Sequence, residues 1–115
     1  MNGDTVKDLW NVIEPKLKSN TEPYADLNAI YELHLLDLEN GVYQLHFKSG
    51  DVSFHDSAIG KADCVLKMKL THFKQFLKGD LNSTMAFMTG RLKVDGHISL
   101  ALKLENMLKK YDFFS

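Results

Sequence analysis

The chain has 115 residues, of which 44% are hydrophobic and 25% charged, a composition typical of one soluble globular domain. Its 14 Lys and Arg nearly balance 15 Asp and Glu, so the formal net charge is -1. That balance excludes a general affinity for nucleic acid, which depends on neutralising phosphates with basic side chains. No apolar run approaches the roughly 20 residues that a membrane-spanning helix needs.

The compartment is predicted from the single cysteine and from the two ends of the sequence. Cys64 has no partner for an internal disulfide, which favours a reducing environment. The first residues contain no apolar signal-peptide core, and the final Phe-Phe-Ser is unlike a peroxisomal Ser-Lys-Leu address. We therefore expect a cytoplasmic protein with a single domain over residues 1–115.

The N-terminal segment has the pattern of an amphipathic helix. Thr5 and Asp8 approximate a capping box, which predicts that the helix begins at Thr5. Helical spacing then places five apolar residues on one face: Val6, Leu9, Trp10, Ile13 and Leu17. Pro15 removes a backbone donor, so we expect either a kink or an end near Ser19. Residues 21–23, Thr-Glu-Pro, predict a further short helical turn.

From Ala29 onward the pattern alternates, and Asn40-Gly41 and Ser49-Gly50 are hairpin signals between three predicted strands. Pairing about these turns places the following residues opposite each other on one face: Leu36 with Leu45, Leu38 with Tyr43, Leu45 with Phe54, and Phe47 with Val52. The other face is polar and partly solvated, with Gln44, His46, Lys48, Ser53 and His55. Leu33 and Leu35 fall on this polar face too, so we expect the first strand to be covered on both sides.

The second half of the chain predicts two more strands and three helices. Residues 63–70 alternate as a fourth strand, with Cys64 on its inner side. Thr71 is expected to cap a short helix that Gly79 ends, and Asn82 to begin another. A fifth strand lies between Gly90 and Gly96, and a last helix continues to about residue 111. This order of elements predicts an α+β fold.

The last predicted helix is apolar around most of its circumference, from Ile98 to Tyr111. A simple surface helix needs an apolar stripe of only about 100°. Two interpretations remain open from the residues alone. The helix is either a core helix between the sheet and the first helix, or one wall of an apolar cavity.

The sequence shows no catalytic or metal-binding constellation. Its five histidines include no closely spaced pair, and no second cysteine completes a metal site. Cys64 occupies a core-facing position, which is typical of a buried apolar residue and not of a nucleophile. We expect a protein that is not an enzyme and has no cofactor and no metal.

Three stretches resemble the sterol-carrier-protein family of non-specific lipid-transfer domains. They are Ala62-Asp63-Cys64, the glycine-bracketed strand Gly90-Arg91-Leu92-Lys93-Val94-Asp95-Gly96, and Leu100-Ala101-Leu102-Lys103-Leu104. The resemblance implies a five-stranded mixed β-sheet with helices packed over one face, enclosing an apolar cavity. By matching position, it implies that the ligand is contacted by Phe73, Phe76, Leu77, Met85, Met88, Leu100, Leu104 and Met107.

The same resemblance implies the function. We expect the domain to bind and carry a hydrophobic ligand, such as a fatty acyl chain, an acyl-CoA, an isoprenoid or a sterol-like molecule. A free-standing domain of this kind is typical of bacteria, which favours an acyl chain or isoprenoid over a sterol. Its expected partners are this small-molecule ligand, a membrane in transient contact, and a partner enzyme. The alternative is a non-enzymatic scaffold that presents a lipid substrate to that enzyme.

Overall fold

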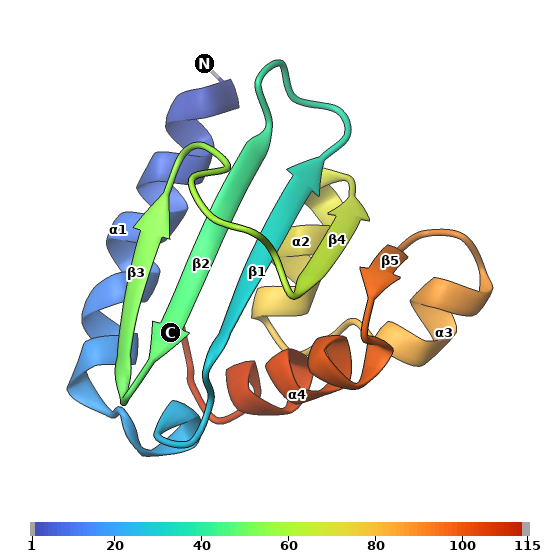
Figure 1. Cartoon of the computed structure of the whole chain (residues 1–115). Helices are drawn as coiled ribbons and strands as arrows, with labels where there is room; N and C mark the ends of the chain where they lie inside the picture. The colour runs from blue at the N-terminus through green and yellow to red at the C-terminus, as the bar shows by residue number, and fades with distance from the viewer. Residues whose placement is uncertain (1, 114–115) are drawn as a thin grey trace.

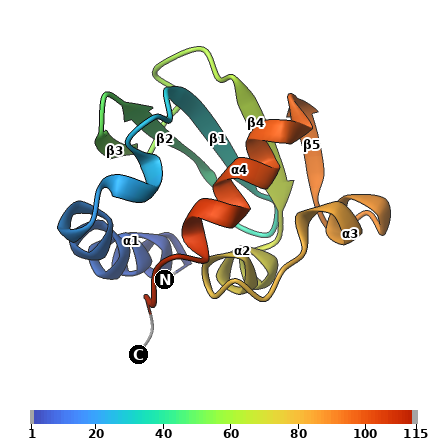
Figure 2. The same ribbon diagram turned by 90° about the horizontal axis from the view of Figure 1, so that it is seen from below.

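A mixed five-stranded sheet carries the helices on one face (Figures 1 and 2). The computed structural model describes residues 2–113, with side chains from Val6 onward. The strands are β1 (Ala29–Leu35), β2 (Val42–Lys48), β3 (Asp51–His55), β4 (Cys64–Met68) and β5 (Lys93–Gly96), in the spatial order β3-β2-β1-β4-β5. β1 and β4 pair in parallel, and the other neighbours are antiparallel. The predicted α+β fold with a mixed sheet is confirmed.

The helices are α1 (Asn2–Ser19), the 3-10 turn η1 (Glu22–Tyr24), α2 (Leu70–Leu77), α3 (Ser83–Met88) and α4 (Ile98–Leu108). Figure 2 shows α1, α2 and α4 on the same side of the sheet, with α3 beside the β5 edge. None of the described helices is both long enough and apolar enough to cross a membrane.

The helix boundaries correct three predictions. α1 begins at Asn2, so Thr5 lies inside it and does not cap it; the helix passes Pro15 and ends at Ser19. α2 begins at Leu70, whose N–H donates to Asp37 Oδ1 at 2.9 Å, and this tertiary bond replaces the cap expected from Thr71. α4 ends at Leu108, three residues earlier than predicted. The cap at Asn82 and the end of α2 near Gly79 are confirmed.

The second hairpin has the predicted register, whereas the first does not. Leu45 lies opposite Phe54, and Ser49 and Gly50 both have positive φ, as a two-residue hairpin turn requires. In the first hairpin, Leu45 instead lies opposite Tyr31, because residues 36–41 form a longer connection. The predicted partner, Leu36, is 57% exposed beyond the end of β1.

The observed register differs from the predicted one by five residues. Because side chains alternate along a strand, a shift by an odd number of residues moves each side chain of β1 to the opposite face of the sheet. Leu33 and Leu35 point into the core and are each 2% exposed, contrary to the prediction that they share the polar face. The outer face of β1 carries Ile30, Glu32 and His34, which are half-buried. The first strand is therefore amphipathic like its neighbours.

Part of the outer face of the sheet, which the sequence predicted to be solvated, is covered at Gln44. Its side chain is fully buried, and its Nε2 donates to the carbonyl of Gly60 at 2.8 Å. Its Oε1 accepts the backbone N–H of Gly60 at 3.1 Å and that of Ile59 at 3.2 Å. One buried amide thereby fixes the β3–β4 connection across the outer face of the sheet, satisfying groups whose burial alone would be unfavourable.

Gly96 provides a test of the glycine-bracketed strand. Both Gly90 (φ 80°) and Gly96 (φ 98°) adopt left-handed backbone conformations, but a Cβ at Gly96 would lie 2.6 Å from the Asp63 carbonyl oxygen. A Cβ at Gly90 would meet nothing within 4 Å. We expect Gly90→Ala to cost about 1 kcal/mol from backbone strain, and Gly96→Ala to cost at least about 2 kcal/mol more, because β4 and β5 must separate. Urea unfolding measures both, and equal losses would contradict the close approach.

Candidate ligand-binding interior

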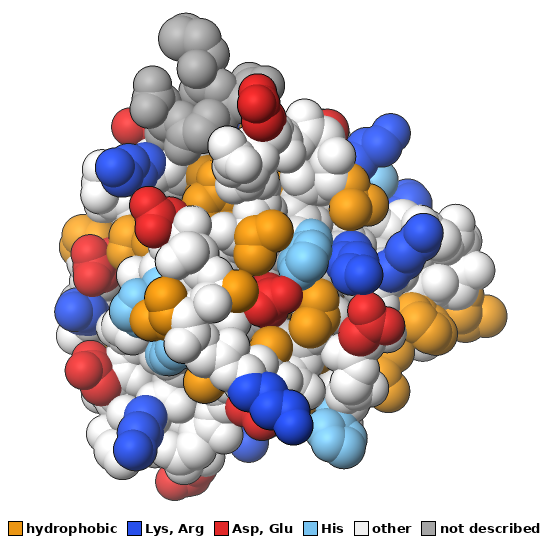
Figure 3. Space-filling model, turned by 45° about the horizontal axis from the view of Figure 1, so that its top comes forward, with side chains coloured by type: hydrophobic (Ala, Val, Ile, Leu, Met, Phe, Trp, Pro, Cys, Tyr) orange, Lys and Arg blue, Asp and Glu red, His pale blue; other side chains and the backbone are white. Residues whose placement is uncertain are grey.

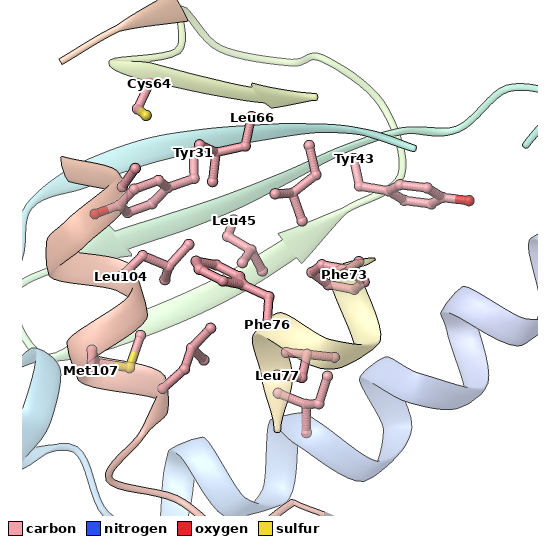
Figure 4. Packing of buried hydrophobic residues seen from close by; sticks show 14 of the residues in the cluster. Tyr31, Tyr43, Leu45, Cys64, Leu66, Phe73, Phe76, Leu77, Leu104 and Met107 are labelled. Atoms are coloured by element: carbon pink, nitrogen blue, oxygen red, sulfur yellow. The ribbon is translucent and has the colours of Figure 1, made fainter. Parts of the chain in front are cut away.

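The inner face of the sheet and the helices enclose a continuous apolar interior (Figure 4). Within it lies a cavity of about 20 Å³, lined entirely by apolar residues: Val6, Leu9, Trp10, Ile13, Leu17, Leu33, Leu45, Phe47, Phe54, Phe73, Leu77, Leu104 and Leu108. Sites that enclose drug-sized ligands span about 300–1,000 Å³. The interior therefore has the chemistry of a lipid site, but it must expand before a lipid chain can occupy it.

Three of the eight predicted contact residues, Phe73, Leu77 and Leu104, line this cavity. Phe76 and Met107 are buried in the same core, at 0% and 3% exposure. Figure 4 shows their side chains among those of α2 and α4, facing the sheet. Leu100 is half-buried, and its carbonyl oxygen accepts the Tyr31 hydroxyl at 2.8 Å. These six residues belong to one connected apolar interior.

The remaining two predicted residues, Met85 and Met88, lie on the surface. They are 58% and 78% exposed, because α3 turns its other side, with Ser83 and Ala86, toward the protein. α3 stands beside the sheet edge and not beneath the sheet (Figure 2), so these methionines do not line the cavity in this structure.

The sequence prediction omitted the part of the lining that comes from α1 and from the sheet. α1 contributes Trp10, among others, and the sheet contributes Leu33, Leu45 and Phe54. The signal was available in the helical spacing of the N-terminal apolar residues and in the shared inner face of the hairpin. Both patterns, however, are equally typical of a filled core, so spacing alone does not assign them to a ligand site.

An aromatic stack closes the cavity between α1 and β3. The rings of Trp10 and Phe54 are stacked with centroids 4.7 Å apart, and Tyr43 stacks on Phe54 at 5.6 Å. Trp10 and Phe54 also line a depression on the outside, together with Lys7, Asn11, His55 and Asp56. One pair of rings thus separates the apolar interior from a polar surface depression.

A buried carboxylate ties α3 to α4. Glu105 is 5% exposed, accepts hydrogen bonds from the Ser83 hydroxyl and from its backbone N–H (2.9 Å), and lies 2.9 Å from Lys109 Nζ. Burial raises the pKa of the Glu105 carboxyl, but the bonds from Ser83 and Lys109 outweigh it and leave the pKa below its usual value. The charged form is therefore the stable one in the folded protein.

Two further sets of reactive side chains are the thiol of Cys64 and a histidine pair on the outer face of the sheet. Cys64 is fully buried, and burial raises the pKa of its thiol to about 11, so it is not a thiolate near neutral pH. His46 and His55 have ring centroids 4.5 Å apart, and burial together with His55 lowers the pKa of His46. Among residues 2–113, no group of three or more His, Cys, Asp or Glu could hold a metal ion.

Residues 11–109 match the SCP-2 sterol transfer family. The chain belongs to this family. It is 37% identical over 107 residues to the human hydroxysteroid dehydrogenase-like protein 2, covering 91% of this chain and 25% of that protein. It therefore spans about a quarter of the length of this curated relative.

Solved structures agree with the family and the fold. Sterol carrier protein 2 from Yarrowia lipolytica, in its apo form, is 30% identical, with 88% of this chain and 87% of that one covered and a TM-score of 0.65. A ubiquinone synthesis protein described as UbiJ-SCP2 shares the fold with a TM-score of 0.76 at 15% identity, covering 95% of this chain and 96% of that one. Proteins of this family bind and transfer lipids, and the apolar interior supports carriage of a hydrophobic ligand by this chain.

The Ser83–Glu105 contact predicts an acid-dependent stability. Because folding lowers the pKa of Glu105, this carboxylate stabilises the fold above its unfolded pKa, near 4.5, and the contribution is lost as pH falls through the lower folded pKa. Ser83→Ala leaves the carboxylate buried with fewer partners, so we expect a loss of about 1–3 kcal/mol near neutral pH. The loss should shrink below the unfolded pKa.

Thr84→Ala, one residue further along α3 and exposed, is the matched control for this substitution. Urea unfolding at neutral and acidic pH measures both variants. A Ser83→Ala loss that is independent of pH would contradict the assigned role of the carboxylate.

Proposed function

We propose that the domain carries a hydrophobic chain, such as a fatty acyl group, an acyl-CoA chain or an isoprenoid, within the interior bounded by α1, α2, α4 and the sheet. The supporting observation is the wholly apolar cavity lining, which contains side chains from all four of these walls. Each CH₂ transferred from water contributes about 0.8 kcal/mol, so a long chain needs few polar contacts. From the predicted set, Phe73, Phe76, Leu77, Leu100, Leu104 and Met107 are proposed to surround the chain.

Movement of the N-terminal half of α1 is the proposed route into the interior. Hydrogen bonds from Tyr24 to the Leu17 carbonyl and from Tyr111 to the Asn20 carbonyl, and one from the Lys16 ammonium to the Asp112 carbonyl, hold its C-terminal end. From Val6 to Ile13, the described contacts are apolar, with the Trp10–Phe54 stack at the rim. The N-terminal half of α1 can therefore move away from the sheet without breaking any of these hydrogen bonds.

The depression outside the stack supplies polar groups for a head group. Lys7, Asn11 and His55 line it beside the rings, together with the acidic side chain of Asp56. A carboxylate or phosphate placed there would accept hydrogen bonds from Lys7, Asn11 and His55 while its chain lies inside. This arrangement favours an amphiphile with one polar end over a molecule that is apolar throughout.

We further propose that the domain is not itself an enzyme and that it works in the cytoplasm. A second candidate function is a module that presents its lipid to a partner enzyme. It is favoured by the relatives named hydroxysteroid dehydrogenase-like protein 2, in which the matched domain is about a quarter of a longer protein. Native mass spectrometry of freshly purified protein, with lipid analysis of its extract, tests carriage in both cases. A co-purifying lipid supports carriage, and failure of oleate, palmitoyl-CoA and geranylgeraniol to raise the melting temperature would contradict it.

Substitutions that enlarge the cavity should distinguish residues that contact the ligand from residues that only pack in the core. Leu104 lines the cavity, whereas Leu66 is equally buried, at 0% against 1% exposure, but does not line it. We expect both Leu104→Ala and Leu66→Ala to cost about 2–5 kcal/mol in the ligand-free protein. Saturating oleate, at a hundred times Kd, adds about 2.7 kcal/mol to each, and we expect Leu104→Ala to reach saturation at a lower concentration. Identical oleate titrations of the two variants would place the ligand elsewhere.

Trp10 should report ligand uptake directly, because it is the only tryptophan in the chain. Oleate that enters beside α1 must separate Trp10 from Phe54, so we expect a saturable change in tryptophan emission. Acetate, which has the carboxylate without the chain, is the control and should produce no change. Oleate binding without any change in emission would exclude the α1–β3 route.

A further inference from the structure

The β2–β3 hairpin brings two histidines together on the outer face of the sheet. His46 lies opposite Ser53 and His55 lies opposite Gln44, so the two histidines are diagonal neighbours on one face. Their ring centroids are 4.5 Å apart, with an angle of 59° between the ring planes. In Figure 3, histidine side chains reach the surface at the left of the molecule, the side on which β3 lies in Figure 1. The register of the hairpin creates this pair of imidazoles.

The hydrogen bonds of Gln44 fix which nitrogen of His46 carries the hydrogen. Gln44 Oε1 accepts the backbone N–H of Gly60 at 3.1 Å, and Gln44 Nε2 donates to the Gly60 carbonyl at 2.8 Å, so the orientation of the amide is set. His46 Nε2 lies 2.8 Å from the same Oε1, which only accepts hydrogen bonds. His46 Nε2 therefore carries the hydrogen, and in the neutral ring Nδ1 carries the lone pair. An imidazole held in this way by its other nitrogen is typical of metal ligands.

His55 is held similarly, by a residue of its own strand. Its Nε2 lies 3.0 Å from the Ser53 hydroxyl oxygen, which accepts a hydrogen bond when Nε2 is protonated. Among the described residues, the Nδ1 atoms of His46 and His55 have no hydrogen-bond partner, and neither atom is enclosed away from solvent. His55 also borders the depression that contains Lys7 and Asp56, whose charges oppose each other. An ion can therefore reach both Nδ1 atoms from solvent.

The separation of the two rings fits two ligands of one metal ion. Imidazole nitrogens bind transition metals at about 2.0 Å, and the centroid of each ring lies about 1.1 Å beyond its nitrogen. Two such rings have centroids about 4.4 Å apart when the N–metal–N angle is near 90°, and about 5.1 Å apart at the tetrahedral angle. The observed 4.5 Å corresponds to adjacent positions on a tetragonal ion. Among divalent first-row ions, Cu²⁺ prefers this geometry and binds nitrogen ligands most strongly.

We propose that His46 and His55 form a surface site for a divalent copper ion, with Nδ1 of each ring as a ligand and water in the remaining positions. Gln44 and Ser53 orient the rings through their Nε2 atoms. Two protein ligands leave the ion open to exchange, unlike the closed four-ligand sites of structural metals. The site departs from the sequence-based expectation of no metal, which rested on residue spacing. Neither histidine lines the apolar cavity, so the proposal does not depend on lipid carriage.

Titration of the full chain with CuCl₂, followed by calorimetry, tests the two ligands. We expect His55→Asn to weaken the tightest Cu²⁺ binding at least about tenfold, because the ion then keeps one imidazole of the two. His97→Asn is the matched control, since His97 is exposed at the start of α4 and its side chain does not cap that helix. Equal Cu²⁺ affinities of these two variants would overturn the proposal.

His46→Asn should weaken Cu²⁺ binding to the same extent as His55→Asn. It also loses the hydrogen bond to Gln44, so its melting temperature without copper shows whether it folds. If His46→Asn does not fold, His55→Asn decides the test, because the His55 ring is bonded only to Ser53 among the described residues.

Electron paramagnetic resonance of the 1:1 copper complex counts the nitrogen ligands. The signal of the wild type and of His97→Asn should be split by two nitrogens, and that of His55→Asn by one. A wild-type signal split by a single nitrogen, or one that His55→Asn leaves unchanged, would show that Cu²⁺ binds elsewhere on the chain and would refute the paired site.

Discussion

The parallel pairing of β1 with β4 is the constraint on which the rest of the structure depends. These two strands occupy the middle of the sheet, and the β2–β3 hairpin extends it on one side while β5 completes the other. A parallel pair needs a long crossover, here made by the hairpin and by the connection that Gln44 fixes on the outer face. Because that connection occupies the outer face, the inner face is left to α1, α2 and α4, which together form the apolar interior.

Most of the fold could be predicted from periodicity and turn chemistry, and its failures have physical causes. Ser49-Gly50 specified a tight hairpin and its register, since both residues take the left-handed conformation that such a turn demands. Asn40-Gly41 gave a similar signal, but the chain uses six residues there, closed by a 2.7 Å bond from the Leu35 N–H to the Gly41 carbonyl. The length of the β1–β2 loop depends on bonds of this kind, so the Asn-Gly pair alone does not predict it. Asp37, which replaces the expected cap at Thr71, is a second case.

The candidate site was predictable in its chemistry and less so in its position. Phe73, Leu77 and Leu104 line the cavity, and the buried thiol of Cys64 agrees with the interpretation of a core residue. Met85 and Met88 lie on the surface because the Ser83–Glu105 contact orients α3, and no local pattern reveals a hydrogen bond across 22 residues. Whether an apolar side chain lines a cavity or fills a core is decided by packing between distant elements, which periodicity does not describe.

The C-terminal end of α1 meets the last described residues of the chain. The Tyr111 hydroxyl donates to the Asn20 carbonyl, and the Lys16 ammonium donates to the Asp112 carbonyl, so contacts between residues more than ninety positions apart secure the first helix. During synthesis, the apolar faces of α1 and of the hairpin are complete long before α4 and residues 111–112 leave the ribosome. The apolar interior is therefore complete only after α4 and residues 111–112 have been made.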